Sequence, residues 1–263
     1  MTRGFGGEVA TCYARHRRGY PPEVLDALTA ALTLDADDTV IDLGCGNGQL
    51  TLPLAARVAA VVGMDPEPDM LTIARTTAVR GGLTNVTWLL GADHDLATVG
   101  RLLGPGTVGA LTIAVAIHFM DRTATFTAAR SMLRPGGGVA VITNGAPLWL
   151  QDSEWSRALR QCLEELLGHP VTGSCQTDEA GRRLNREALV AAGYRYAEAG
   201  VAYDAALTVE DMVGGVFSAM SADRLPTAER RAAFTAEVRD ALGGRNAVTE
   251  RVHVWLQYGA RDS

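Results

Sequence analysis

Lysine is absent from this chain of 263 residues, and all 24 of its basic side chains are arginine. Acidic side chains outnumber them at 30, so the formal net charge is −6 at neutral pH. Nucleic-acid-binding domains usually carry a basic surface. The composition therefore disfavours a nucleic-acid partner and suits a neutral or cationic small substrate.

Cysteine is scarce, and its spacing matches no metal-binding pattern. The four residues Cys12, Cys45, Cys162 and Cys175 form no C-x-x-C pair and no Cys/His ligand spacing. We therefore expect no metal site, and reduced thiols as in a cytoplasmic protein.

Long apolar runs are also missing. The N-terminal sequence MTRGFGGEVATCYARH lacks the apolar segment that a signal peptide needs. The longest apolar run, around 110–120, is too short to span a bilayer. We expect a cytoplasmic protein with no membrane partner.

Apolar stretches of strand length alternate with stretches of helical length as far as Asn144. This alternation predicts an α/β fold with a mostly parallel sheet. Expected strands cover 39–43, 60–65, 86–91, 110–116 and 138–143, and expected helices cover 48–56, 68–81 and 122–133. The breaker RPGGG at 134–138 should separate the last helix from its strand.

The alternation stops after Asn144. Helices are expected at 153–167, 185–193, 209–220 and 227–242, strands at 197–207 and 252–259, and a polar stretch at 168–183. Residues 145–183 and 208–246 are interpreted as insertions that form a lid or side wall.

The most informative segment is VIDLGCGNGQL at 40–50. It predicts a buried strand, a glycine loop and a helix start, a unit that can hold a nucleotide. Gln49 stands where the dinucleotide fingerprint needs its last glycine, which disfavours NAD. Asp65 ends the next strand, at the separation that places a carboxylate beside a ribose.

Four segments in order, VIDLGCGNGQLTLPLA, VVGMDPEPDML, LLGADHDL and LRPGGGVAVIT, resemble the successive motifs of class I S-adenosylmethionine-dependent methyltransferases. The resemblance covers about 40–144. It implies a Rossmann-like fold whose seven-stranded, mostly parallel sheet ends in an antiparallel hairpin. It also implies S-adenosylmethionine as cofactor and S-adenosylhomocysteine as product.

On this interpretation the chain has three parts. Residues 1–38 form a helical cover over the cofactor, and 39–144 form the cofactor-binding core. Residues 145–263 complete the sheet and carry the two cap insertions for acceptor binding. We expect a monomer or a homodimer.

The resemblance places the glycine loop against the amino-acid part of the cofactor. The backbone N–H groups of Gly44, Gly46 and Gly48 would face it, with Cys45 tolerated between them because it is small. Asp42 would lie near the cofactor's ammonium group or the water around it.

The adenosine half would contact the next two motifs. Asp65 would accept hydrogen bonds from the ribose hydroxyls, although it can also be read as a helix cap before Pro66. Pro66 and Met70 would pack on the adenine, unless Met70 is ordinary core. Ala92 and Asp93 would read the adenine amine.

The leader YARHRRGYP, which begins at Tyr13, resembles that of a branch of small-molecule, antibiotic-tailoring methyltransferases. There, Arg17 would reach the cofactor carboxylate. Tyr13 and Tyr20 would line the chamber in which the methyl group moves, where aromatic rings stabilise a sulfonium. The alternative is a solvated basic helix.

The segment AIHFMD at 116–121 falls where this family places residues that face the acceptor, and it departs from the N/D-P-P-Y/F motif of base and amide methylation. His118 is the candidate for orienting or deprotonating the acceptor, or a structural histidine. Phe119 would wall the chamber or lie in the core.

The acceptor is the least determined feature. The cap is rich in carboxylates, which favours N-methylation of an amine on an amino-sugar or aminoglycoside-like antibiotic intermediate by in-line displacement. The carboxylates in question are Asp152, Glu154, Glu164, Glu165, Asp178, Glu179, Asp204, Glu210, Asp211 and Asp223. Two alternatives stay open: O- or C-methylation of a polyketide, terpenoid or peptide, and a non-catalytic module that only binds the cofactor.

Overall fold

A computed structural model describes residues 4–173 and 175–262. Its strands are β1 (Thr39–Leu43), β2 (Ala60–Asp65), β3 (Val86–Leu90), β4 (Val108–Ala114), β5 (Leu133–Thr143), β6 (Arg195–Thr208) and β7 (Ala247–Ala260). Its α-helices are α1 (Glu8–His16), α2 (Pro22–Ala31), α3 (Thr51–Ala55), α4 (Pro68–Arg80), α5 (Leu96–Leu103), α6 (Arg122–Met132), α7 (Glu154–Leu167), α8 (Glu179–Ala191), α9 (Val209–Phe217) and α10 (Ala228–Ala241). Short 3₁₀ helices are η1 (Asp93–Asp95), η2 (Ile117–Phe119), η3 (Leu148–Leu150) and η4 (Ala222–Arg224).

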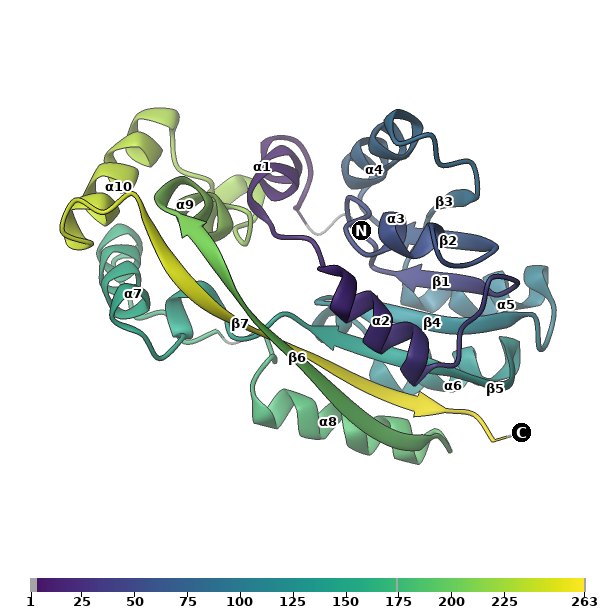
Figure 1. Cartoon of the computed structure of the whole chain (residues 1–263). Coiled ribbons are helices and arrows are strands. Elements are labelled where there is room, and N and C mark those ends of the chain that lie inside the picture. The colour runs from purple at the N-terminus through teal and green to yellow at the C-terminus, as the bar shows by residue number, and fades with distance from the viewer. Residues whose placement is uncertain (1–3, 174, 263) are drawn as a thin grey trace.

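The strands form one seven-stranded sheet in the order β3-β2-β1-β4-β5-β7-β6 (Figure 1). The first five strands are parallel, and β7 is antiparallel to both of its neighbours, β5 and β6. The predicted fold class is confirmed. From β1 the strands are added toward one edge of the sheet as far as β3, and from β4 onward they are added toward the other edge. Ligands of such sheets bind at the carboxyl ends of the two strands on either side of this switch point, here β1 and β4.

Apolar side chains cover both faces of the sheet. One face packs on α2 and α3 through a cluster that includes Leu28 and Leu54, and the other packs on α5, α6 and α8 through a cluster that includes Phe126 and Leu189. Because both faces are covered, β4 is a nearly continuous buried run and not an alternating one.

The last two strands extend well beyond the sheet. β7 pairs with β5 only over 255–260, whereas it pairs with β6 along its whole length, from Ala260 opposite Arg195 to Ala247 opposite Thr208. Residues 201–208 and 247–254 therefore form a two-stranded arm that runs from the sheet to α9 and α10 (Figure 1).

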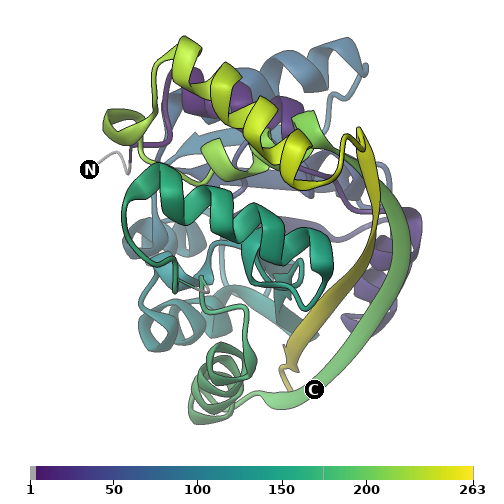
Figure 2. The ribbon, with the colours of Figure 1, turned by 90° about the vertical axis from the view of Figure 1, so that its left-hand side faces the viewer.

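A third hydrophobic cluster lies at the end of this arm and holds α7, α9 and α10 together (Figure 2). We call these helices with η3 the cap. Phe234, Leu159 and Met212 are fully buried in it. The cap therefore has a core of its own, separate from the two cores of the sheet.

Several sequence expectations differ from the structure, and the strand expected at 252–259, for example, begins at Ala247. The helix expected at 185–193 begins earlier, at Glu179, because the Asp178 carboxylate accepts a hydrogen bond from Gly181 N at 2.9 Å and caps it. The strand expected at 138–143 begins at Leu133 and absorbs the glycines through a shift of register beside Gly109. α2 and α5 were not predicted. In the described part of the chain, no helix is both long and apolar enough to cross a membrane.

Candidate functional site

The glycine loop follows β1 in a conformation that only glycine adopts easily. Gly44, Gly46 and Gly48 have φ values of 72°, 53° and 86°, in the left-handed region that side chains disfavour. A Cβ on Gly44 would lie 2.6 Å from the Cβ of Ala116, at the end of β4. The loop therefore folds closely over the switch point.

The N–H groups of this loop are used inside the protein, which corrects the expectation that they face the ligand. Gly44 N and Cys45 N both donate to the Met64 carbonyl, at 2.7 and 3.1 Å. Gly46 N donates to Asp65 Oδ2 at 2.8 Å, and Gly48 N donates to the Cys45 carbonyl. The glycines thus shape the wall of a cavity, and hydrogen bonds to a ligand there would come from other groups.

A cavity of about 780 Å³, measured to its open mouth, lies over the ends of β1, β2 and β4. Its lining brings together residues from the glycine loop, both later motifs and the leader. These are Phe5, Tyr13, Leu43, Gly44, Gly46, Asp65, Pro66, Glu67, Met70, Ala92, Asp93, Ala114, Val115, Ala116, Phe119 and Met120. We call it the first cavity.

Asp65 lies in this cavity, 8% exposed, at the end of β2. Its Oδ2 accepts from Gly46 N and its Oδ1 from Glu67 N, both at 2.8 Å. Burial raises the pKa of Asp65, and these two N–H groups act against the rise. The helix-cap alternative is wrong, because α4 begins at Pro68 with Glu67 as its N-cap.

Asp42 does not line the first cavity, in contrast to the expectation that it approaches the cofactor. It is 1% exposed beneath the loop, where Thr51 Oγ1 and Thr112 Oγ1 donate to its two oxygens at 2.6 and 2.9 Å. Burial raises the pKa of Asp42 to about 6. Its hydrogen bonds tie β1 to α3 and β4.

The residues expected to hold the adenine reach the first cavity together. Pro66, Met70, Ala92 and Asp93 all line it. Met70 is 4% exposed, so it is core and cavity wall at once. One oxygen of Asp93 accepts from Asp121 N at 3.0 Å and fixes this carboxylate at the start of η1.

A second, larger cavity of about 1170 Å³, again to its open mouth, lies between the sheet edge, α1 and the cap. It shares Phe5, Tyr13, Val115 and Phe119 with the first cavity. His118 and Tyr20 line only the second cavity. The residues expected at the adenosine thus line the first cavity and His118 lines the second, and the two cavities meet at one junction; Cys45 and Gly48, also expected at the cofactor, line neither.

Aromatic rings dominate this junction. Phe5 and Phe119 pack edge to face with ring centroids 5.8 Å apart. The pKa of Tyr13 is raised by burial, as expected of a phenol held between the two chambers. Val115 has φ 53°, an unfavourable value for a β-branched residue. Sequence reasoning missed Phe5 and Val115, since neither stands in a recognisable motif.

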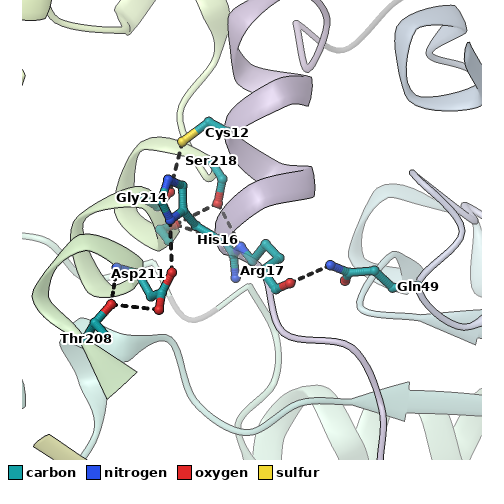
Figure 3. A network of polar contacts seen from close by, with 9 residues as sticks. Cys12, His16, Arg17, Gln49, Thr208, Asp211, Gly214 and Ser218 are labelled. Atoms are coloured by element: carbon teal, nitrogen blue, oxygen red, sulfur yellow. Dashed lines mark hydrogen bonds and ion pairs between the residues drawn. The ribbon is translucent and has the colours of Figure 1, made fainter. Parts of the chain in front are cut away.

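Arg17 was expected to reach the cofactor, but it does not line the first cavity. Its Nε donates to Ser218 Oγ at 2.8 Å, and its Nη2 donates to the Gly215 carbonyl at 3.2 Å (Figure 3). Its own carbonyl accepts from Gln49 Nε2 at 2.6 Å. Arg17 lines the second cavity and joins the leader to both the cap and the glycine loop.

His16 makes a further polar contact between α1 and α9. Its Nδ1 lies 3.0 Å from Asp211 Oδ1, and Thr208 Oγ1 donates to the other oxygen of Asp211 (Figure 3). The hydroxyl of Thr208 also caps α9. The leader is therefore a fixed wall of the second cavity and not a solvated basic helix.

The acidic lining expected for the second cavity is mostly absent. Of the ten cap carboxylates named from the sequence, Asp211 is the one that lines the cavity. The other carboxylate there is Glu250, which was not predicted and whose Oε2 lies 2.7 Å from Arg18 Nη1. Among the described residues, no cluster could hold a metal ion.

Comparisons with known proteins agree with this geometry. The methyltransferase-domain family matches residues 40–137. An uncharacterized methyltransferase of Mycobacterium tuberculosis is 35% identical over 144 residues, which are 55% of this chain and 53% of that protein. A ubiquinone biosynthesis O-methyltransferase of Cereibacter sphaeroides is 37% identical over 98 residues, 37% of this chain and 38% of that protein.

This chain thus spans about half the length of the first of these relatives, and less of the second. Among solved structures, a putative type II methyltransferase from Anaeromyxobacter dehalogenans superposes with a TM-score of 0.58 at 22% identity, over 93% of this chain and 96% of that one. That likeness shows the fold. Residues 40–137 thus resemble the methyltransferase-domain family, and the whole chain shares the fold of that solved methyltransferase.

Proposed function

We propose that this protein transfers the methyl group of S-adenosylmethionine to a small-molecule acceptor. The observation that carries the proposal is the junction of the two cavities at Phe5, Tyr13, Val115 and Phe119. The first cavity is lined mainly by the segment that matches the family, and the second also by the N-terminal residues, the cap and β7. Such a pair can hold a donor and an acceptor in contact.

The first cavity suits an adenosyl compound. It combines the apolar walls of Met70 and Ala92 with the carboxylates of Asp65 and Asp93, the apolar lining with few polar groups that is typical of small-molecule sites. In the proposed complex, Asp65 binds the ribose and Asp93 the adenine amine. Bound S-adenosylmethionine supplies an electrophilic methyl group on a sulfonium.

The residues of the junction then align the reactants. The rings of Phe5, Tyr13 and Phe119 exclude water and favour a cation near their faces. Holding a nucleophile in line in a dry chamber supplies roughly 7–11 kcal/mol of barrier reduction. His118, in the second cavity, is placed to orient the acceptor or to take its proton.

The second cavity favours a partly apolar acceptor over a polycation. Its two carboxylates are already paired, Asp211 with His16 and Glu250 with Arg18. Leu148 and Trp149 add apolar wall, while Asn144 Oδ1 is buried without a partner. We therefore propose O-, N- or C-methylation of an amphipathic metabolite that carries a hydrogen-bond donor.

N-methylation of an amino-sugar or aminoglycoside-like compound is the second candidate. Asp211, with 42% of its side chain exposed, is the observation that favours it, because an ammonium acceptor could bind there. The ubiquinone biosynthesis O-methyltransferase supports methyl transfer in general. Its match covers 98 residues, 37% of this chain and 38% of that protein, so it leaves the acceptor undetermined.

The test uses the purified chain with methyl-labelled S-adenosylmethionine and panels of amines, phenols and alcohols, and carbon nucleophiles. Mass spectrometry should find labelled product in a panel of partly apolar acceptors, with S-adenosylhomocysteine formed in equal amount. Tight binding of the cofactor with no turnover on any panel would contradict the proposal and favour a non-catalytic binding module.

A further inference from the structure

Glu67 is a buried carboxylate in the first cavity that the proposed function does not yet use. It is the N-cap residue of α4 and is 6% exposed. It lines the cavity beside Asp65 and Met70. Its Oε2 atom is buried without a hydrogen-bond partner. A desolvated carboxylate oxygen that accepts nothing is costly, and a bound ligand is the natural source of a donor.

The other oxygen of Glu67 faces the N-terminal residues. A Cβ on Gly6, just ahead of α1, would lie 2.9 Å from Glu67 Oε1, so the backbone passes close to this carboxylate. Two residues further along α4, Asp69 Oδ2 accepts from Gly7 N at 2.6 Å. Residues 6–7 thus cover the Oε1 side of the Glu67 carboxylate, while Oε2 is buried without a partner in a residue that lines the cavity.

Asp65 alone has limited capacity to accept hydrogen bonds from a ribose. Each of its oxygens already accepts one backbone N–H group, from Gly46 or from Glu67. A ribose diol brings two further donors into the same place. A second carboxylate with an unused acceptor, two residues along the chain, can share them.

We propose that Glu67 Oε2 accepts a hydrogen bond from a ribose hydroxyl of the bound cofactor, so that two carboxylates hold the diol. The inference rests on the proposed function, because it requires an adenosyl compound in the first cavity. It makes Glu67 a residue that selects for an intact ribose. Burial, followed by the charges of Asp69 and Asp65, raises the pKa of Glu67, consistent with an acid held in dry surroundings.

The experiment combines variants of the protein with variants of the ligand. Calorimetry measures the affinity of the full chain for S-adenosylhomocysteine and for its 2′-deoxy and 3′-deoxy forms. The wild type should lose about tenfold or more in affinity for the form that lacks the hydroxyl bound by Glu67. Glu67→Ala should bind that form and the parent compound about equally.

Two further variants separate this role from a structural one. Glu67→Gln keeps the size of the side chain and weakens the acceptor, so its preference for the intact ribose should be smaller than that of wild type. Asp69→Ala removes the acceptor of Gly7 N and a neighbouring charge but keeps the Glu67 carboxylate, and it should retain the preference for the intact ribose. Melting curves verify that each variant is folded.

The outcomes are distinct. If Glu67→Ala and Glu67→Gln both keep the wild-type preference for each hydroxyl, this inference is overturned while the proposed function stands. If the wild type binds no S-adenosylhomocysteine, the proposed function fails, and the role of Glu67 fails with it.

Discussion

Two aspartates at adjacent strand ends show how position decides the role of the same residue type. Asp42 is held under the glycine loop by two threonine hydroxyls, whereas Asp65 faces the first cavity. Desolvation raises the pKa of both. Asp42 acts on the stability of the fold, and in the proposed complex Asp65 acts on the cofactor.

The pH dependence of stability should reveal Asp42. Its pKa is about 6 in the folded protein against 3.8 when unfolded, so the folded state holds the proton more tightly. That stabilisation is present below pH 3.8 and is lost as the pH rises through about 6. Between these limits the wild type should lose up to about 3 kcal/mol of unfolding free energy relative to Asp42→Asn. Urea titrations across this range measure it, and a constant difference between the two proteins would refute it.

His118 should matter for turnover and not for cofactor affinity, because it lines the second cavity and not the first. We expect His118→Ala to lower the turnover number at least about tenfold and to leave S-adenosylhomocysteine affinity nearly unchanged. Rate assays and calorimetry check both. His253→Ala, an exposed histidine on β7, is the matched control. A near-normal rate for His118→Ala would make His118 structural.

Residues in a local motif were predictable, and residues whose role depends on distant contacts were not. Asp65, Met70 and Asp93 follow strands in family-like motifs, and the structure places them in one cavity. Arg17 was assigned to the cofactor, yet its partners lie about 200 residues away in α9. No local pattern reports such a contact.

Among the elements, helix α1 connects the cap with the helices that cover the sheet. It packs against both α9 and α4 (Figures 1 and 3). It passes close to α9 at Gly214, where a Cβ would lie 2.1 Å from His16 Cγ. A glycine inside a helix is intrinsically unfavourable, so this one is explained by the close crossing.

Gly214→Ala should therefore separate α1 from α9. Overpacking of this kind costs typically 1–3 kcal/mol, which outweighs the gain in helix propensity. Adding His16→Ala should restore part of the loss, because it removes the ring that the methyl group meets. Thermal melts of the four proteins form a double-mutant cycle.

The neighbouring Gly215→Ala is the control for that cycle, since its Cβ would meet only the flexible end of Leu148, at 3.0 Å. It should destabilise the protein less than Gly214→Ala does. Additive losses in the cycle would contradict the proposed steric contact between His16 and Gly214.

The predicted bounds were nearly correct for elements with strong hydrophobic periodicity. They were misplaced for elements whose start is fixed by a capping side chain. β1 and β2 match the predicted ranges, because they are mostly apolar and are followed by Gly44 and Pro66. α8 was placed too late, since its first turn is polar and is fixed by Asp178. A polar first turn resembles a loop when hydrophobic spacing is the guide.

At the scale of the molecule, the long arm of β6 and β7 carries the cap over the edge of the sheet (Figures 1 and 2). The cap buries its own cluster, and Phe234 packs against Phe217 there with ring centroids 5.6 Å apart. Units with separate cores can open independently. The second cavity is thus lined partly by a unit that does not line the first.

Phe234→Ala should loosen the cap selectively. Removing a fully buried phenylalanine costs about 3–5 kcal/mol. Hydrogen exchange measured by mass spectrometry should speed up in 154–167 and 209–241 while β1 and β4 stay protected. A uniform rise in exchange across the sheet would contradict an independent cap.

The order of the strands in the sheet could be predicted from the sequence, but the lining of the second cavity could not. Alternating strands and helices with one glycine loop leave few topologies, and the resemblance selected among them. The acidic composition of the cap suggested a lining of carboxylates, yet a helix exposes its charges to solvent on the side away from its core. Which of them face inward depends on the packing of three helices that no single segment specifies.

The central claim is that an adenosyl compound binds over the ends of β1, β2 and β4. The most direct measurement is a crystal structure of the chain grown with S-adenosylhomocysteine. We predict density with the ribose at Asp65, the adenine beside Met70 and Ala92, and the sulfur directed to the junction at Tyr13 and Phe119. An empty first cavity at saturating ligand, or NADH bound there in its place, would contradict it.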